Sequence, residues 1–319
     1  MKRLNGVQKS LAPVVIFAYN RPRHLLNCLN SLKSNLESTD TDFLVFIDGP
    51  RNQEDKKKQK ELINIIEKFQ ETLSLKVEFG KDNLGLAPSV INGLNKVFEV
   101  YEKAIIVEDD LVVSSFFLAF CNEGLDQYSE IKEVASIHGF SYKFNRPEAK
   151  PYFLRGADCW GWATWRDRWQ LFESDPKKLI MEINLLKLRR RFDLEGAYPY
   201  YRMLERQSRN EISSWAIRWH ASMFIANKLT LYPHISLVRN DGLDGSGTHA
   251  TNSKSHDSVF PINKIELNAV PVSESKSARK KLKKYLKSHY ETGSSYSLFR
   301  IYKGLFRRLS KYTKKYKYL

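Results

Sequence analysis

Short apolar runs and helical repeats alternate along the first 120 residues of the chain. The apolar runs, rich in β-branched and aromatic residues, have the character of buried strands and lie at 14–18, 43–47, 75–79 and 105–107. The segments between them repeat apolar residues at the spacing of helices, at 25–32, 56–73 and 88–101. Strands that are covered on both faces and alternate with helices predict a doubly wound, mostly parallel α/β sheet flanked by helices.

Three consecutive acids follow the fourth apolar run. Glu108, Asp109 and Asp110 come where the strand 105–107 leaves the sheet, and open α/β sheets bind ligands at the carboxyl ends of their parallel strands. Crowded carboxylate oxygens there suit Mg²⁺ or Mn²⁺, especially when substrate phosphates complete the coordination. An isolated acidic triplet is more often a solvated turn, so the other motifs have to decide between these interpretations.

The middle of the chain is rich in tryptophan. Trp160, Trp162, Trp165 and Trp169 fall within ten residues, and Gly161 allows close backbone approach between the first two. Flat aromatic faces with polar neighbours suit a sugar ring, although each ring is equally compatible with core packing. Further along, the polar segment 240–249 carries three glycines and predicts a loop that approaches a ligand.

Composition and charge restrict the class of protein. The 319 residues are 42% hydrophobic and 28% charged, and no apolar run approaches the roughly 18 residues of a membrane span. A cytoplasmic location is therefore expected. The three cysteines have neither a CxxC pair nor metal-ligand spacing.

The net charge of +16 is concentrated in the C-terminal tail. Residues 276–319 hold fifteen Lys and Arg and one acid, whereas residues 1–275 hold 37 basic and 35 acidic side chains. Apolar residues recur at helical spacing within this tail, around Leu282 and again from Leu298 to Leu309. Such basic amphipathic helices fit an anionic membrane surface, and nucleic acid, which would use the same charge, is the less favoured partner. We expect a catalytic domain over 1–260, with halves at about 10–125 and 126–260, and a linker and tail over 261–319.

Seven sequence blocks occur together in one order. They are PVVIFAYNRP (13–22), FIDGP (46–50), NLGLAPSVINGL (83–94), IIVEDDLVVSSFF (105–117), WGWATW (160–165), SWAIRW (214–219) and LVRNDGLDGSGTH (237–249). Through these blocks residues 10–250 resemble the GT-A glycosyltransferases, in particular bacterial family-2-like enzymes with a layout similar to N-acetylglucosaminyltransferase I. The resemblance implies a GT-A (Rossmann-like) fold and a nucleotide-sugar donor.

The resemblance also implies roles for particular residues. Arg21 and Asp48 are expected at the nucleotide, and Asp110 as the direct ligand of Mn²⁺ or Mg²⁺. Glu108 is expected to face the donor sugar or the acceptor, and Asp109 to support ribose or metal. For the substrate, the expected contacts are Trp160, Gly161, Trp162 and Trp215.

The catalytic base is left open by the sequence. Similar enzymes carry an aspartate near the start of a Trp-rich helix, where this chain has Ser213 and Ser214. Glu211 is the nearest carboxylate, and Asp244 or His249 in the glycine-rich loop are alternatives.

These observations predict a metal-dependent transferase. We expect a hexosyl- or N-acetylhexosaminyltransferase that uses a UDP-sugar in preference to other donors, inverts the anomeric centre and acts on a glycan or lipid-linked glycan in bacterial surface polysaccharide or lipopolysaccharide synthesis. The basic tail would hold it at the inner face of the cell membrane. The alternatives are a sugar nucleotidyltransferase, for which the N-terminal phosphate loop is missing, and a non-enzymatic polyanion-binding protein.

Overall fold

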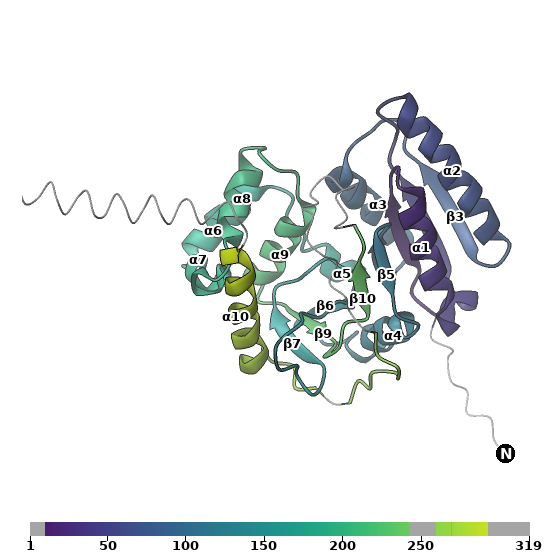
Figure 1. The fold of residues 1–319 in the computed structure, drawn as a ribbon. Helices are drawn as coiled ribbons and strands as arrows, with labels where there is room; N and C mark the ends of the chain where they lie inside the picture. Colours follow the sequence, from purple (N-terminus) through teal and green to yellow (C-terminus); the bar gives the residue numbers. More distant parts are fainter. Residues whose placement is uncertain (1–9, 243–259, 269, 293–319) are drawn as a thin grey trace, which may run out of the picture.

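The computed structural model describes residues 10–242, 260–268 and 270–292. Its main feature is an eight-stranded sheet with the order β3-β2-β1-β4-β8-β6-β9-β7. Helices flank this sheet, as Figure 1 shows. The predicted fold class, an α/β fold with helices around a mostly parallel sheet, is confirmed.

The N-terminal half of the sheet is parallel throughout. It consists of β3 (Ser74–Phe79), β2 (Asp42–Ile47), β1 (Val14–Ala18) and β4 (Lys103–Glu108). The crossovers are α1 (Pro22–Lys33), α2 (Gln53–Gln70) and α3 (Leu86–Val100). β1 lies at the centre, paired with β2 on one side and β4 on the other, and all five of its residues are buried. This burial explains the continuous apolar runs in the sequence.

The C-terminal half of the sheet is mixed. β8 (Trp162–Trp165) runs antiparallel to both β4 and β6 (Val134–His138), and β9 (Leu229–Tyr232) is parallel to β6 and antiparallel to β7 (Tyr152–Arg155). A second, two-stranded sheet pairs β5 (Leu111–Val113) with β10 (Val238–Asn240). The helices of this half are α4 (Phe117–Gln127), α5 (Arg166–Trp169), α6 (Pro176–Leu185), α7 (Arg189–Phe192), α8 (Tyr200–Ser208) and α9 (Trp215–Ile225). Two 3-10 helices, η1 (Leu36–Asp40) and η2 (Leu194–Gly196), complete the order.

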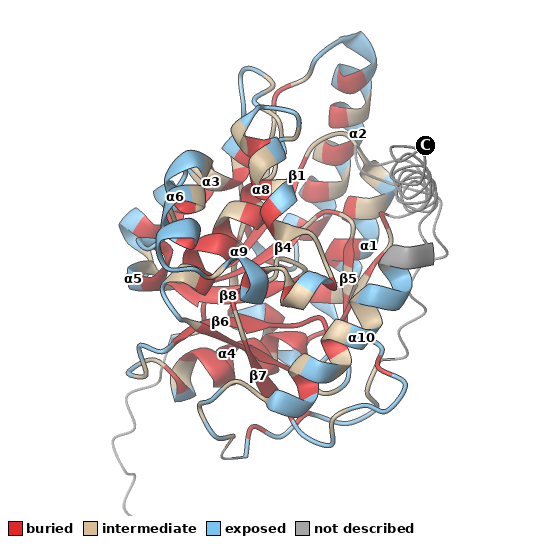
Figure 2. Ribbon diagram, turned by 90° about the vertical axis from the view of Figure 1, so that its left-hand side faces the viewer, coloured by how far each residue is buried: buried red, intermediate tan, exposed pale blue. Residues whose placement is uncertain are grey.

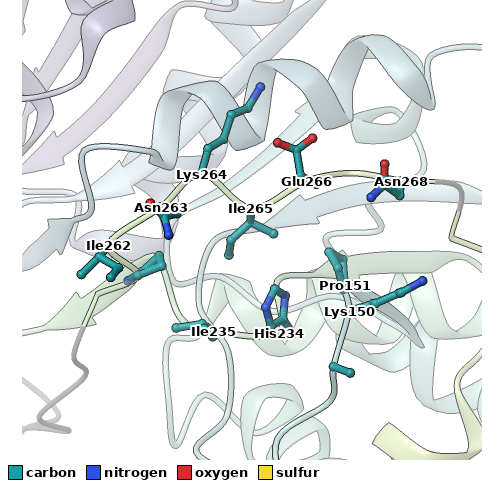
Figure 3. A pocket seen from close by; sticks show the side chains of 12 residues that line it. Lys150, Pro151, His234, Ile235, Ile262, Asn263, Lys264, Ile265, Glu266 and Asn268 are labelled. Carbon is teal, nitrogen blue, oxygen red and sulfur yellow. The ribbon is translucent and has the colours of Figure 1, made fainter.

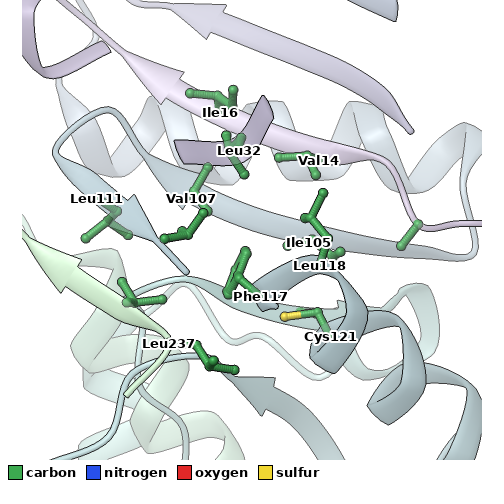
Figure 4. Close-up of a cluster of buried hydrophobic side chains, with 14 of the residues drawn as sticks. Val14, Ile16, Leu32, Ile105, Val107, Leu111, Phe117, Leu118, Cys121 and Leu237 are labelled. Carbon is green, nitrogen blue, oxygen red and sulfur yellow. The ribbon is translucent and has the colours of Figure 1, made fainter. Parts of the chain in front are cut away.

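Two hydrophobic clusters cover opposite faces of β1 and β4. Ile16 and Val107 pack with α1 and α4 on one face, whereas Val15 and Ile106 pack with α3 and α9 on the other. Figure 4 shows the first cluster, in which Phe117 lies below Val107 and Ile105. Figure 2 shows that the buried residues line the space between sheet and helices. This double coverage fixes the direction of β4, and with it the position of the acids that follow.

The Arg-rich segment 177–204 is divided into several short helices. The structure has α6, α7, η2 and the start of α8 there. The breaks coincide with left-handed backbone at Lys187 (φ 55°), Glu195 (φ 54°) and Gly196 (φ 86°). Lys187 follows the end of α6, whereas Glu195 and Gly196 lie within η2. Phe192 of α7 belongs to a buried cluster with Ile183 and Phe224.

The beginning of the tail packs on the body of the protein. In α10 (Lys276–Thr292), Ala278 and Leu282 are buried against Tyr152, Leu154 and Leu194. The expectation that the tail from Lys276 onward stands apart from the catalytic unit is therefore wrong for this helix. Residues 298–309, the second expected helix, lie outside the described residues, and the division into domains at residue 260 stays a prediction. No helix in the described part of the chain is both long and apolar enough to cross a bilayer.

Candidate active site

The carboxyl ends of β1, β2 and β4 bring the predicted nucleotide and metal residues to one edge of the sheet. The amide of Asp48 donates to Ala18 O (3.1 Å), and the amide of Asp109 donates to Phe17 O (3.0 Å). These bonds continue the strand pairing by one residue on each side of β1. Asp48 and the acidic triplet therefore flank the β1–α1 loop that carries Arg21.

Arg21 bridges two of the three acids. Its guanidinium donates to Asp110 Oδ2 at 3.0 Å and also to Asp109 Oδ1. Burial opposes the charge on Arg21, but the two aspartates more than offset this effect and raise its pKa. The pair Arg21–Asp109 is nearly buried, with 3% of the Asp109 side chain exposed. A fixed positive charge thus lies among three carboxyl groups.

Crowding and burial disfavour full ionisation of the triplet. Burial, followed by the charges of Asp110 and Asp109, raises the pKa of Glu108 to about 8. Burial also raises the pKa of Asp109 to about 6, although Arg21 opposes the rise. Like charges at this spacing need a cation or a proton between them.

Several carboxylate oxygens of the triplet, including one of Asp109 and one of Asp110, accept no hydrogen bond from the described residues. Asp109 Oδ2 is a buried oxygen without a hydrogen bond, and Asp110 Oδ1 accepts none of the described hydrogen bonds while its side chain keeps 13% of its surface exposed. Mg²⁺ and Mn²⁺ commonly take one or two carboxylates and complete their shell with phosphate and water. The residues present therefore fit such an ion. No group of three His, Cys, Asp or Glu side chains able to hold a metal occurs within 10–242, 260–268 and 270–292, so an all-protein cage is not formed there.

The small sheet fixes Asp110 from the other side. Pairing of β5 with β10 brings the amide of Asp241 to Asp110 O at 2.9 Å. Gly242 then passes so close that a Cβ there would lie 2.2 Å from Asp110 Oδ2. A larger residue at this position would therefore displace the Asp110 carboxylate. The LVRNDG motif of the sequence supplies this contact.

Asp48 is occupied by a neighbouring loop. Its Oδ1 accepts from the amides of Gly49 (3.0 Å) and Leu84 (2.9 Å), and its Oδ2 accepts from Asn83 Nδ2 (2.9 Å) and the amide of Gly85 (2.8 Å). Each oxygen of the Asp48 carboxylate thus accepts two hydrogen bonds. Asp48 thus shapes the loop that leads into α3, and any effect on a nucleotide would act partly through this loop. The sequence marked the Asn83–Gly85 motif but not this interaction.

Asp55 is a further residue that the sequence reasoning missed. From the first turn of α2 it accepts from Asn20 Nδ2 (2.6 Å), from the amide of Arg51 (3.1 Å) and from the Tyr19 hydroxyl. It therefore ties the loop after β1 to the loop after β2. The signal was weak, because a buried acid in a lysine-rich helix looks like part of a solvated face.

The tryptophans divide into buried and partly exposed rings. Trp162 and Trp215 are buried, and their rings stack with centroids 5.6 Å apart. Protein therefore covers both rings. Trp160 is half-buried and meets Phe140 edge to face. Gly161 has φ 63°, and a Cβ there would lie 2.7 Å from Val238. Of the predicted sugar contacts, Trp160 is the ring with accessible surface.

The candidate bases lie in different surroundings. Glu211 is at the surface, where its carboxylate pairs with Arg209 Nε at 2.6 Å and Arg206 Nε at 3.3 Å. The hydrogen bond from Arg209 lowers the pKa of Glu211, which makes this carboxylate a weaker proton acceptor. Asp244 and His249 lie outside the described residues.

A separate groove lies away from these acids. It has a volume of about 400 Å³ and is lined by 149–151, 234–235 and parts of 261–268. Figure 3 shows Lys150, His234 and Lys264 on its walls. None of the predicted site residues that the structure describes lines this groove, so it is no part of the site described here.

Comparisons with known proteins give likeness only at the level of solved structures. The sequence matches no protein-family model and no curated protein. TarS of S. aureus (residues 1–349) is 16% identical with a TM-score of 0.36, over 49% of this chain and 47% of that one. The same protein in complex with UDP is 19% identical with a TM-score of 0.34, over 44% and 38%.

A third similar structure is the mannosyltransferase PcManGT from Pyrobaculum calidifontis in complex with GDP-Man and Mn²⁺. It is 14% identical with a TM-score of 0.31, over 43% of this chain and 40% of that one. The chain thus spans less than half the length of the protein in each of these three structures. At this level of similarity, the chemistry of the site has to carry the functional conclusion.

Proposed function

We propose that the protein is a glycosyltransferase that moves a sugar from a nucleoside-diphosphate sugar to a glycan or lipid-linked glycan. The observation that carries the proposal is the meeting of Arg21 with three adjacent carboxyl groups at the carboxyl edge of the parallel strands. A diphosphate donor carries two features that this site complements. It offers anionic oxygens to Arg21, and it can complete the shell of a cation held by carboxylates.

Different residues of the chain have different roles in the transfer. Asp110, aided by Asp109, would hold the divalent ion, which would neutralise the charge that develops on the departing diphosphate. Arg21 supplies a second positive charge at the same place. Asp48 and Asn83 shape the loop before α3, on the nucleotide side. Glu108 faces the donor sugar or the acceptor.

An inverting reaction also needs a base for the acceptor hydroxyl. Because Glu211 is paired with two arginines, Asp244 and His249 are the better candidates. Both follow Gly242 closely in the sequence, and Gly242 contacts Asp110. We propose inversion with one of these two residues as base, and a UDP-sugar as the preferred donor.

A ligand screen tests the proposal directly. UDP-, GDP- and dTDP-sugars, each with and without Mn²⁺, should be compared by thermal shift, because a ligand of the native state raises the melting temperature by mass action. We expect a UDP-sugar to stabilise the protein only when Mn²⁺ or Mg²⁺ is present, and slow release of UDP. If no nucleotide sugar shifts the melting temperature or is hydrolysed, the proposal is wrong.

We also propose a location at the cytoplasmic face of a membrane, where surface polysaccharide or lipopolysaccharide acceptors are assembled. The support is a stripe of exposed lysines along α10, formed by Lys276, Lys280, Lys284 and Lys287. The apolar side of this helix packs against β7. The contact with the membrane would therefore be electrostatic, at roughly 1 kcal/mol per lysine.

Charge reversal tests this location without removing any packed residue. Changing the four lysines to glutamate should release the protein from vesicles containing anionic lipid, while donor hydrolysis stays unchanged. A second variant that ends after Thr292 shows whether residues 293–319 contribute. Unchanged sedimentation of both variants with the vesicles would contradict a tail-mediated contact.

A further inference from the structure

A narrow cavity lies beside Asp158, in the connection between β7 and β8. Its walls include Asp158, Tyr200, His220 and Tyr232, which come from that connection, α8, α9 and β9. Leu282 of α10 closes one side. The volume is about 20 Å³, which is room for a single hydroxyl group or water molecule.

Asp158 carries a carboxylate without a cationic partner among the described residues. Its Oδ2 accepts from the hydroxyls of Tyr142 (2.7 Å) and Tyr232 (2.8 Å). Its Oδ1 takes part in none of the described hydrogen bonds or ion pairs, and it is not among the fully buried atoms without a partner. A half-buried carboxylate held by two hydroxyls and no cation is costly for the fold alone. It suits a site that takes hydrogen-bond donors.

His220 and Tyr200 add two more polar atoms to the same cavity. His220 Nδ1 lies 2.9 Å from Ala157 O and 3.3 Å from Ala157 N, and the shorter contact assigns its proton to Nδ1. Burial lowers the pKa of His220 and keeps the ring neutral, so Nε2 is an acceptor. The ring stacks on Tyr200 at 4.5 Å. Within the described part of the chain, neither His220 Nε2 nor the Tyr200 hydroxyl has a hydrogen-bond partner.

The cavity is electrostatically linked to the acidic triplet. Cys159, the residue after Asp158, has a pKa raised by burial and by the charges of Glu108, Asp158 and Asp110 together. Cys159 is therefore near both Asp158 and the acidic triplet. The amide of the next residue, Trp160, donates to His138 Nε2 (3.1 Å), which fixes the connection over the end of β6. Trp160, the half-buried ring of the tryptophan block, thus follows Asp158 by two residues.

We propose that Asp158, Tyr200 and His220 form an acceptor subsite, in which one hydroxyl group of a carbohydrate enters the cavity. The inference rests on the glycosyl transfer proposed above. Two of the three groups only accept hydrogen bonds, and the third can do both, a set that matches a sugar hydroxyl. The aromatic walls exclude water around it, which favours a ligand with alternating polar and apolar faces.

Binding of simple glycosides to the full chain tests the subsite. The methyl glycosides of glucose, galactose and N-acetylglucosamine would be titrated by saturation-transfer NMR with UDP and Mn²⁺ present. Tyr200→Phe removes a hydroxyl that bonds to no described residue, so the fold should be unaffected. We expect this variant to weaken glycoside binding about tenfold, and Asp158→Asn to weaken it further.

A matched variant separates binding from packing. Tyr152→Phe removes a hydroxyl from a ring that stacks on Tyr232 at 5.6 Å, but this hydroxyl bonds to Ser141 and not to Asp158. It should leave glycoside binding unchanged. UDP affinity should be the same in all three variants.

The possible results divide clearly. Glycoside affinity equal to that of the parent in Tyr200→Phe and Asp158→Asn would overturn the subsite, as would a parent that binds none of the three glycosides. Equal weakening by Tyr152→Phe would also overturn it, because the effect would then be one of packing. If the parent does not bind UDP, that result would instead count against the proposed function. Any glycoside binding would then be a separate observation.

Discussion

The two halves of the sheet hold their polar groups in different ways. In the parallel half, the acids lie directly after strand ends, and backbone bonds such as Asp109 N to Phe17 O fix them at the edge. In the mixed half, Asp158 lies in a connection that crosses between strands, and tyrosines from distant segments fix it. The first arrangement depends on local sequence and strand direction. The second depends on contacts between residues up to 74 positions apart.

This difference leads to opposite expectations for substitutions in the two halves. Changes to the acids of the parallel half should affect ligands far more than stability, because each acid lies outside the hydrophobic clusters. Changes to the tryptophans of the mixed half should affect stability first, since Trp162, Trp169, Trp215 and Trp219 belong to one buried cluster.

The largest expected effect is that of Asp110→Ala. Removing this carboxylate takes away the accessible oxygen of the triplet and one partner of Arg21. We expect Mn²⁺-dependent UDP binding to fall below detection, while the melting temperature stays within a few degrees of the parent. Calorimetric titration of UDP with and without Mn²⁺ measures this.

The exposed Asp40 gives a matched control for charge alone. Asp40→Ala should bind UDP as the parent does. Unchanged UDP affinity in Asp110→Ala would remove Asp110 from the metal site.

How much the sequence predicted follows the same division. The strands of the parallel half are confirmed to within one or two residues, because double coverage leaves an unbroken apolar run. The positions of Asp48 and of the acidic triplet at the ends of β2 and β4 could be predicted for the same reason. That Asp48 is saturated by four donors could not, because three of them come from the loop 83–85, more than 30 residues away.

In the mixed half the sequence reasoning was less complete. β7 was not predicted, and β8 was hidden inside the tryptophan block, where aromatic residues suggested a binding surface more strongly than a strand. Asp158 escaped notice because nothing near it in sequence reveals Tyr142 and Tyr232 as its partners. Helical spacing predicted α10 correctly, but it could not predict what the helix packs against. An apolar face can pack on a membrane or on the protein itself.

The next largest effect is expected from Trp162→Ala. The ring is fully buried and lies within 5.3 Å of Trp219 and 5.6 Å of Trp215, centroid to centroid. Removing it should lower the free energy of unfolding by about 3–5 kcal/mol, the usual cost of an aromatic cavity. Urea denaturation followed by circular dichroism measures the loss. A change below about 1 kcal/mol would show that this half is less tightly packed than the contacts indicate.

A smaller effect is expected from Gly242→Ala. Gly242 comes two residues after the end of β10 and lies against Asp110. The added Cβ would lie 2.2 Å from Asp110 Oδ2, so the carboxylate has to move. We expect roughly tenfold weaker Mn²⁺-dependent UDP binding, equivalent to about 1.4 kcal/mol, with little change in stability. The exposed Asp40→Ala variant serves again as the control and should keep the parent affinity in Mn²⁺. Full retention of Mn²⁺-dependent binding would show that Asp110 adjusts without loss.

The smallest effect concerns the attachment of α10 to the mixed half. Arg279 donates two hydrogen bonds to Glu195 (2.7 and 3.1 Å) and Lys283 a third (3.1 Å), which together lower the pKa of Glu195 to about 2. Because the folded-state pKa lies below the ordinary value of 4.5, the stabilisation is complete above about pH 4.5 and is lost as the pH falls toward 2. Since the pair is partly solvated, we expect Glu195→Gln to cost only about 1 kcal/mol at pH 7 and nothing near pH 2. Hydrogen exchange of the α10 amides at several pH values measures this, with Glu148→Gln, which removes the ion pair to Lys281, as the comparison. Equal protection of α10 in Glu195→Gln and in the parent at pH 7 would show that Ala278 and Leu282 hold the helix without help from the charges.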